Sequence, residues 1–201
     1  MNAVELIALA STASLLAGWR LYLVTLVTGL AMKFGWIDLP ERLHALDVIA
    51  NNWVLGIAAV GTIAEFFADK IAWVDSAWDT IHSVIRPLGG ALLSLAIIDA
   101  GDPTWQVASF LLGGGAAFIA HAGKAGARTI VNASPEPFSN IAVSTAEDIA
   151  TGGLLALAIA NPIAAALIAA ILVLLSLWLV VAARRLLRRL VGDGGLNRTP
   201  T

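Results

Sequence analysis

The chain has 201 residues, of which 59% are hydrophobic and only 13% are charged, and it contains no cysteine. Soluble domains usually carry about 25% charged residues, so this chain cannot cover a folded surface with polar groups. The composition therefore excludes a disordered chain, a coiled coil and an ordinary cytosolic enzyme, and it leaves no thiol for disulfides or metal binding. Hydrophobic runs of about 20 residues recur along the sequence, which predicts transmembrane helices.

The charges are unevenly distributed along the chain. Acidic residues outnumber basic ones up to residue 180, whereas Arg184, Arg185, Arg188 and Arg189 follow directly on the most hydrophobic run. Positive charge beside a span favours the cytoplasmic side of a membrane. We therefore expect a multi-pass protein of the inner (cytoplasmic) membrane with its C-terminus in the cytoplasm. Nucleic acid is not an expected partner, because the arginine run is joined to a span.

Hydrophobic spans are predicted, in chain order, at residues 4–34, 53–73, 88–98, 104–131, 140–160 and 163–183. The first is long and is interrupted at Gly18–Trp19–Arg20, so we expect one tilted helix or a helix with a local break. A short amphipathic helix is predicted over residues 75–86, ending before Pro87. Two breaks follow, a turn at residues 99–103 and a proline-rich segment at residues 132–139. The second is either a plain turn or a re-entrant break whose helix start faces a ligand.

The spans form one predicted transmembrane domain, residues 1–190, followed by a disordered tail at residues 191–201. Leu15–Gly18 resembles Leu111–Gly114, and each is followed at nearly the same distance by a Pro-Glu pair. This similarity pairs residues 1–100 with residues 104–190. Halves with three spans each lie antiparallel, which makes an inverted repeat.

A rival alignment of Trp53 with Trp105 would make the copies parallel, and chance similarity also stays open in a chain this rich in Ala, Gly and Leu. The predicted fold class is therefore all-α. We expect a polytopic membrane protein with about six transmembrane helices, with or without two inverted three-helix repeats, plus the short amphipathic helix.

Few charged residues lie inside the hydrophobic spans, and they recur at spacings of three or four, so they share helix faces. Ionisable groups at membrane depth cost several kcal/mol each, so they persist only when paired, hydrated or functional. The second and fifth spans contribute acids and the fourth contributes bases, which predicts that these groups meet. The candidate ion- or substrate-binding residues are Glu65, Asp69, Lys70, His121, Lys124, Arg128, Asn140, Glu147 and Asp148.

Two interpretations of these residues stay open. One is an ion or proton site near the middle of the membrane. The other is a structural ion-pair network completed by Arg20 that only locks the helices together. For His121, Lys124 and Arg128 a further alternative is a cradle for an anion or a lipid head group.

Asp75, Asp79 and His82 fall on one stripe of a helix. Two carboxylates and an imidazole on one face suit a divalent cation, so these residues are candidate metal ligands. The alternative is an interfacial helix whose polar face is simply hydrated, with Trp73 and Trp78 as interface anchors. No catalytic residue is assigned, and a divalent metal ion is the one cofactor that the sequence suggests.

Long motifs carry a resemblance to a known family. They are Glu65-Phe-Phe-Ala-Asp-Lys70, Asp75-Ser-Ala-Trp-Asp79 and Ser134-Pro-Glu-Pro-Phe-Ser-Asn140. Through them, residues 5–190 are similar to a bacterial family of small integral membrane proteins described as a domain of unknown function. The resemblance implies a membrane protein and no particular activity, and Ala72 stands where a proline is expected.

Glu65, Asp69 and Lys70 also resemble, in residue type though not in spacing, the Glu-x-Gly-Asp-Lys motif of cation exporters and cation/proton exchangers, which have two inverted three-helix halves. We expect a transporter or channel for a small ion or polar solute, with a divalent cation exchanged for protons at intramembrane carboxylates as the leading substrate. One alternative is a membrane-embedded enzyme acting on lipid or isoprenoid phosphates. Another is a structural or assembly protein. Besides the lipid bilayer, a second copy of the chain is a candidate partner.

Overall fold

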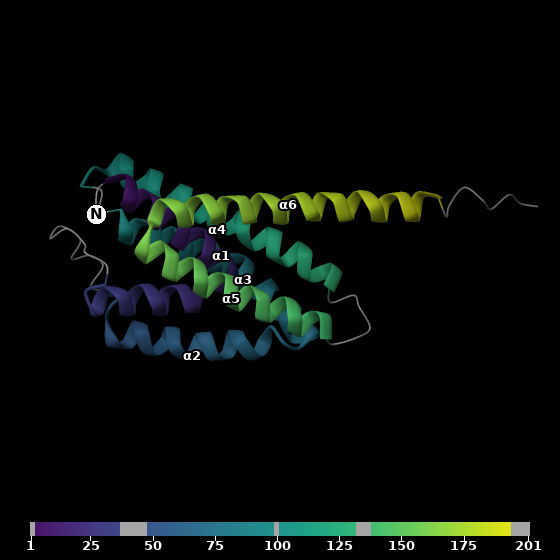
Figure 1. Cartoon of the computed structure of the whole chain (residues 1–201), viewed down its shortest axis with the longest axis horizontal. Helices are drawn as coiled ribbons and strands as arrows, with labels where there is room; N and C mark the ends of the chain where they lie inside the picture. Colours follow the sequence, from purple (N-terminus) through teal and green to yellow (C-terminus); the bar gives the residue numbers. More distant parts are fainter. Residues whose placement is uncertain (1–2, 37–47, 99–100, 132–137, 194–201) are drawn as a thin grey trace, which may run out of the picture.

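The computed structural model describes residues 3–36, 48–98, 101–131 and 138–193, and this part of the chain is helical apart from its connections. The helices are α1 (Ala3–Lys33), α2 (Asn52–Ala68), α3 (Ala72–Ile97), α4 (Pro103–Val131), α5 (Phe138–Ala160) and α6 (Pro162–Asp193). They form an elongated bundle whose helices run roughly along the horizontal axis of Figure 1. The predicted all-α fold class is confirmed.

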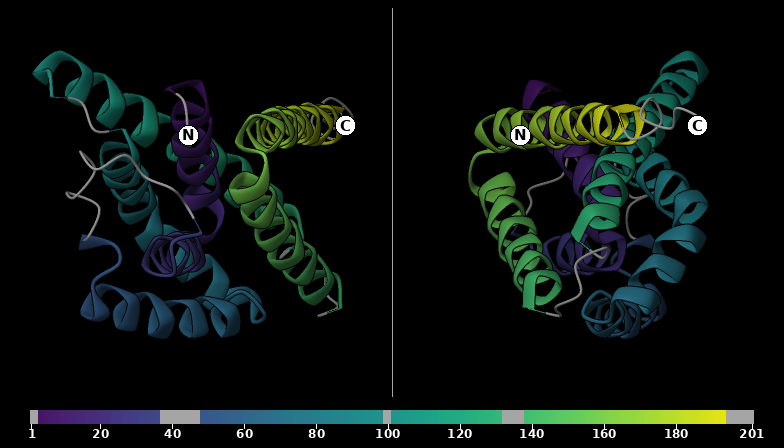
Figure 2. Two further views of the ribbon diagram at one scale, coloured as in Figure 1. Left: turned by 60° about the vertical axis from the view of Figure 1, so that its left-hand side comes forward. Right: turned by 90° about the vertical axis from the view of Figure 1, so that its right-hand side faces the viewer.

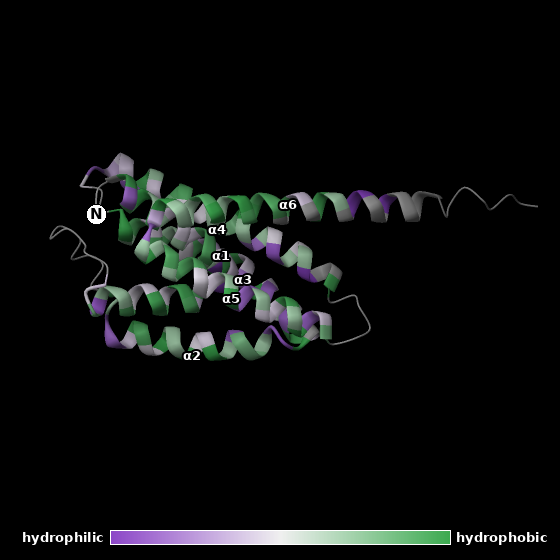
Figure 3. Ribbon diagram, in the orientation of Figure 1, coloured by the Kyte–Doolittle hydropathy of each residue, from purple (hydrophilic) through white to green (hydrophobic). Residues whose placement is uncertain are grey.

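Within the described residues α1, α3, α4, α5 and α6 are long and apolar enough to cross a membrane, and α2 is a shorter apolar helix. Exposed aromatic residues lie in the first turns of four helices, Trp53 in α2, Trp105 in α4, Trp73 in α3 and Phe138 in α5. Helices α2 and α4 begin at the left end of Figure 1, and α3 and α5 begin at the right end. Aromatic residues gather at the two interfaces of a membrane with water. Figure 3 shows hydrophobic ribbon over most of the bundle, with hydrophilic stretches toward the right-hand ends of α4 and α5 and in the far half of α6. The chain is therefore a multi-pass membrane protein.

Helix α1 bends sharply at Arg20, whose backbone is non-helical (φ −142°, ψ 73°). The segment before Arg20 runs inward from the left end, and the segment after it returns to the left end (Figures 1 and 2). Contacts agree, because Ile7 shares a small pocket with Ile98 at the left end of α3, and Gly29 lies against Ile49, just before α2. The predicted interruption of the first span is confirmed, and it divides α1 into two helical segments that form a hairpin with its tip at Arg20.

The stretch between residues 53 and 98 is divided differently from the prediction. The second span was expected to continue to residue 73, but α2 ends at Ala68. The separate amphipathic helix expected over residues 75–86 is wrong, because α3 runs without interruption from Ala72 to Ile97 with Pro87 inside it. Proline is tolerated inside a membrane helix where neighbouring groups satisfy the backbone that it frees, and α3 packs against both α1 and α4.

Local sequence explains several helix ends. Gly35 adopts φ +67°, and the Trp36 N–H donates back into the last turn of α1 at 2.7 Å, which is a cap that favours glycine. The Asn51 side chain accepts from the backbone N–H two residues later at 2.9 Å, and Asp102 accepts from the Thr104 N–H at 2.7 Å. Both are N-caps of the kind that Asn and Asp provide.

Helix α6 is longer than the predicted span of residues 163–183. Its hydrophobic part is Pro162–Ala182, and the rest carries exposed Arg184, Arg185 and Arg188 away from the bundle (Figure 1). At 1.5 Å per residue the helix is about 48 Å long, which is enough for its arginine end to extend beyond a hydrocarbon core of roughly 30 Å. Residues 191–193 of the expected tail continue the helix. The rest of that tail, and the proline-rich segment at 132–137, lie outside the described residues.

Gly18→Ala is expected to destabilise the protein, because α1 and α4 approach too closely there for a side chain. A Cβ atom at Gly18 would lie 2.2 Å from the Ala117 carbonyl oxygen. Overpacking costs about 1–3 kcal/mol, which thermal unfolding in detergent would report as a lower midpoint. Gly115→Ala on α4 is the matched control, because nothing lies within 4 Å of its Cβ position. Equal midpoints for the two variants would contradict the close packing.

Candidate functional site

Seven charged side chains converge where the tip of α1 meets α4, α5 and the segment between α2 and α3. We name this group the central cluster. Its members are Arg20, Asp69, Lys70, Lys124, Arg128, Glu147 and Asp148. The meeting of acids and bases that the sequence predicts is therefore found in the structure.

Asp69 lies at the centre of this cluster, and its side chain is completely buried. Its Oδ2 lies 2.5 Å from Arg20 Nη1, 2.9 Å from Lys124 Nζ and 3.5 Å from Arg128 Nη2. Several cationic side chains thus share a single carboxylate oxygen. No donor in the described part of the chain reaches the other oxygen, Oδ1, which is also buried. Asp69 therefore holds the helices together and keeps one oxygen available.

The acids of α5 form the less buried side of the central cluster. Glu147 Oε2 lies 3.0 Å from Arg128 Nη2, and the Glu147 side chain is 17% exposed. Asp148, which is 23% exposed, places Oδ1 2.8 Å from Arg20 Nη2 and Oδ2 3.3 Å from Lys70 Nζ. Both carboxylates bind bases that come from other helices, so α5 is tied to α1, α4 and the α2–α3 connection.

Two neutral side chains of α5 form hydrogen bonds with members of the central cluster. Asn140 accepts from the Arg128 guanidinium, and its amide donates to the Asp69 carbonyl oxygen at 3.1 Å. Ser144 Oγ accepts from Lys70 Nζ at 3.0 Å. Asn140 was predicted as a site residue, whereas Ser144, four residues further along the same face, was not among the predicted residues.

Glu65 belongs to a second group that lies outside the central cluster. Its Oε1 accepts from Arg86 Nη2 at 2.7 Å, and Arg86 Nη1 lies 2.7 Å from Asp79 Oδ1. The same Nη1 lies 2.8 Å from His121 Nδ1. We name Glu65, Asp79, Arg86 and His121 the Arg86 cluster. Glu65 and Asp69 therefore bind different partners. Glu65 lies within α2, whereas Asp69 follows its last residue, Ala68.

Hydrogen bonds indicate which ring nitrogen carries the proton in two buried histidines. His82 Nδ1 lies 2.8 Å from the Trp78 carbonyl oxygen, which can only accept, so Nδ1 donates and Nε2 faces the Tyr22 hydroxyl at 3.2 Å. In His121, Nδ1 accepts from a guanidinium, so Nε2 carries the proton and faces Ser83 Oγ at 3.1 Å. Both imidazoles are therefore engaged on both nitrogens.

The structure does not bring the predicted metal ligands together around one point. Asp79 pairs with Arg86, both ring nitrogens of His82 have partners, and Asp75 Oδ2 lies 3.9 Å from Arg128 Nη1. In the described ranges no group of three or more His, Asp or Glu side chains is arranged to hold a metal ion. These three residues share a helix face, as their spacing predicts, but a metal site is not formed there in this arrangement.

A polar cavity of about 230 Å³ lies between α3 and α4. Its charged lining residues are Asp75, Asp79 and Arg128, and its hydroxyl groups come from Ser76, Thr80 and Ser83. Arg128 belongs to the central cluster and Asp79 to the Arg86 cluster, so the cavity borders both. A polar space of this size has room for several water molecules beside both clusters.

Besides Ser144, the sequence-based prediction missed Arg86 and Tyr22 as site residues. Arg86 follows Asp79 by seven residues, so the helical stripe already pointed to it. No pattern pointed to Tyr22, because its contact with His82 joins residues that are 60 positions apart.

The fold and the buried charges define the class of the protein, a helical multi-pass membrane protein with a charged interior. The chain belongs to the family described as Domain of unknown function (DUF4126), which matches residues 7–182. This match confirms the resemblance that the sequence motifs indicate. No curated protein and no solved structure matches the chain.

Proposed function

We propose that the protein is a transporter of a small cation, which intramembrane carboxylates bind in exchange for the protein's own basic side chains. The observation that carries this proposal is the reversal of α1, which places Arg20 at the tip of a hairpin against buried Asp69. Irregular backbone at membrane depth is tolerated only where it is buried in protein or lines a cavity, and interrupted helices form the ion sites of many transporters.

The contacts at the hairpin tip support a movable element. Arg20 binds Asp69 through Nη1 and Asp148 through Nη2, and Lys124 Nζ donates to the Trp19 carbonyl oxygen beside the bend at 3.1 Å. Withdrawal of the tip would break the ion pairs of Arg20 together. It would leave Asp69 and Asp148 with one basic partner fewer each, so a cation that takes the place of Arg20 would couple binding to hairpin movement.

A divalent cation exchanged with protons is the substrate that we propose. Asp69 Oδ1 and Glu65 Oε2 are buried carboxylate oxygens that no donor among the described side chains reaches. Carboxylate oxygens are preferred ligands of hard divalent cations. The cation would compete with Lys124 and Arg128 for these acids. Alternating access needs two states, and here they would be one in which the acids pair with the protein's own bases and one in which they bind the cation.

The polar cavity indicates the side from which the carboxylates are reached. Asp69 lies just before Trp73 at the right end of the bundle, and the cavity residue Asp75 lies in the first turn of α3. The α1 hairpin fills the bundle from the left end (Figure 1). In this state we propose that ions enter from the right end, and that the opposite state requires the hairpin to move.

We propose that α1 enters and leaves the membrane on one side while α2 to α6 cross it, which places the two termini on opposite sides. Helix α2 has 17 residues, at the lower limit for a span. The arginine run after α6 favours a cytoplasmic C-terminus, so the right end would be cytoplasmic. The inner membrane as location and a homo-oligomer stay predictions.

The inverted repeat also stays a prediction. Helices α1 and α4 both contribute basic residues, and α2 and α5 both contribute acidic residues, although α4 has no counterpart of the bend in α1.

Flux through proteoliposomes tests the proposal. The full chain is expected to move Mn²⁺ or Mg²⁺ into liposomes faster than empty liposomes do, with protons moving the other way. Glu147→Gln keeps the side-chain size and removes its charge, so the initial rate is expected to fall about tenfold or more, as loss of a charged contact does. Glu65→Gln is expected to slow flux as well.

Asp102→Asn is the matched control for this experiment, because Asp102 is an exposed carboxylate at the start of α4. It is expected to keep the wild-type rate. Unchanged flux in both glutamine variants, with monodisperse protein on size exclusion, would sink the proposal, and so would wild-type flux no faster than that of empty liposomes for every cation tried.

A structural role is the second candidate function, and the dense pairing favours it. Each acid of the central cluster has a basic partner within 4 Å. A network that only locks helices would give no flux, and Glu147→Gln would then change stability alone. The enzyme alternative has no comparable support, because Asp75, Asp79 and His82 do not form a metal group.

A further inference from the structure

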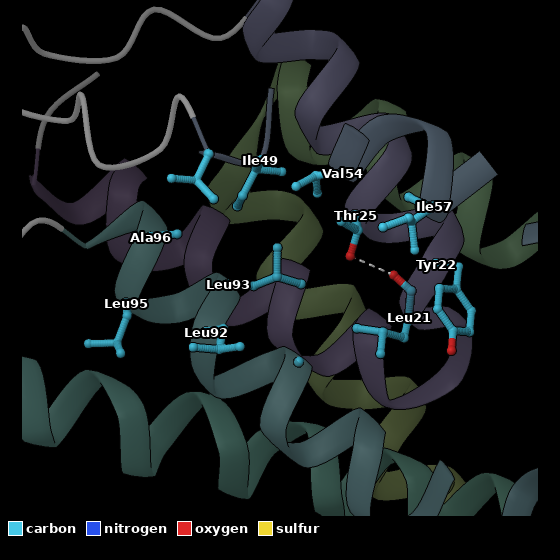
Figure 4. A pocket seen from close by; sticks show the side chains of 13 residues that line it. Leu21, Tyr22, Thr25, Ile49, Val54, Ile57, Leu92, Leu93, Leu95 and Ala96 are labelled. Atoms are coloured by element: carbon cyan, nitrogen blue, oxygen red, sulfur yellow. Dashed lines mark hydrogen bonds between the residues drawn. The ribbon is translucent and has the colours of Figure 1, made fainter. Parts of the chain in front are cut away.

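A second cavity, apolar and separate from the charged clusters, lies among α1, α2 and α3. Its volume is about 510 Å³, and Figure 4 shows the side chains around it. The lining residues are Leu21, Tyr22, Thr25, Val48, Ile49, Val54, Ile57, Ala58, Gly89, Leu92, Leu93, Leu95 and Ala96. Nearly all are aliphatic, so the cavity suits a hydrocarbon.

The two polar side chains of the lining are already engaged elsewhere. The Thr25 hydroxyl donates to the Leu21 carbonyl oxygen at 2.9 Å, the contact drawn as a dashed line in Figure 4. The Tyr22 hydroxyl faces His82 Nε2 at 3.2 Å. A ligand in this cavity therefore meets hydrocarbon walls and no available donor, which excludes a polar solute as its occupant.

The cavity opens on the membrane-facing surface. Val48, Ile57 and Leu92 line it, and each of these side chains is more than half exposed. Ala58, in contrast, is buried at the inner wall. The hydrocarbon around a membrane protein therefore has direct access to this space, and filling it recovers the dispersion contacts that an empty cavity loses.

Markers of the membrane interface lie at one end of the cavity. Exposed Trp36 follows the end of α1 and exposed Trp53 lies in the first turn of α2. Both helix ends lie at the left end of Figure 1, and tryptophans indicate the depth of the lipid head groups. Lys33, also exposed, lies at the same end and donates to Asn52, which starts α2 two residues before the lining residue Val54. The Lys33 ammonium group therefore lies at head-group depth, close to one end of the apolar cavity.

We propose that this cavity is a binding site for a bilayer phospholipid, with one acyl chain between α2 and α3 and the phosphate at Lys33. Charge complementarity places the head group, because a phosphate pairs with a lysine. The apolar lining and the open face accommodate the chain. The inference does not depend on ion transport, because none of its residues belongs to the central cluster or the Arg86 cluster.

Photolabelling of the full chain in liposomes tests the proposal. The probe is phosphatidylglycerol with a diazirine near the end of one acyl chain, and mass spectrometry locates the adducts. Adducts are expected to concentrate on residues 21–25, 54–58 and 89–96. Ala58→Phe fills the inner wall and is expected to reduce these adducts about tenfold, whereas Ala156→Phe, on the exposed face of α5, is expected to leave them unchanged.

Lys33→Gln tests the head-group contact and is expected to lower the yield of cavity adducts about twofold to fourfold, as loss of an exposed ion pair does. Wild-type adducts spread evenly over exposed residues of other helices, such as Leu111 and Leu112 of α4, would overturn the site. That map decides the question even if Ala58→Phe fails to fold. Labelling unaffected by Lys33→Gln would overturn the placement of the phosphate.

Discussion

Asp69→Asn is expected to lower the free energy of unfolding by about 3–5 kcal/mol, because it leaves buried cations without their shared anion. Arg20, Lys124 and Arg128 all lie within 3.5 Å of the same Asp69 oxygen, and each of these side chains is at most 2% exposed. An amide of the same size keeps the volume but removes the charge. The expected loss of unfolding free energy therefore comes from the uncompensated cations and not from a cavity.

Denaturant unfolding in detergent measures this effect, with Asp102→Asn as the control of equal chemistry. Asp102 is exposed, and the hydrogen bond from the Thr104 backbone N–H lowers the pKa of its carboxyl group. Asparagine caps a helix as well as aspartate does, so the control is expected to unfold at the wild-type midpoint. A midpoint for Asp69→Asn equal to that of the control would show that Asp69 does not hold the network together.

Arg86→Met is expected to have an effect of similar size, again about 3–5 kcal/mol. Arg86 is completely buried and places its two Nη atoms 2.7 Å from Glu65 and from Asp79. Methionine fills much of the same volume and offers no donor. Two carboxylates, one of them 1% exposed and the other 8% exposed, then remain inside the bundle without their cation.

A double-mutant cycle separates this charge effect from packing. Arg86→Met alone leaves the Glu65 carboxylate buried without its cation, and Glu65→Gln removes that negative charge. The double variant is therefore expected to be more stable than Arg86→Met alone. The coupling free energy is expected to be about 1–3 kcal/mol. Additive effects of the two substitutions, measured by the same unfolding curves, would contradict the ion pair.

Helical spacing predicts which charged residues share a face, but not which partners they choose. Glu65 and Asp69 are one turn apart, so their joint face follows from the sequence. The structure ends α2 before Asp69 and sends the two acids to different clusters. Part of what holds Asp69 in place is the amide of Asn140, 71 residues away, and no local pattern records such a contact.

Hydropathy likewise predicts the extent of α1 but not its path. Residues 4–34 are apolar whether the helix crosses the membrane or turns back within it, and the interruption at Gly18–Trp19–Arg20 marks only the position of a break. The reversal also depends on where Arg20 finds its carboxylates, Asp69 and Asp148. The same limit applies to the polar stripe of α3, whose face was predicted while its partners on α1 and α4 were not.

The hairpin form of α1 has a consequence for the order of assembly during synthesis. Arg20 is synthesised before Ser144, whose carbonyl oxygen accepts its hydrogen bond and which lies 124 residues further along the chain. An arginine without partners is expensive in lipid, so the hairpin cannot settle when it is made. We therefore expect α1 to reach its final place only after α5 has been inserted, although α1 precedes α5 in the chain.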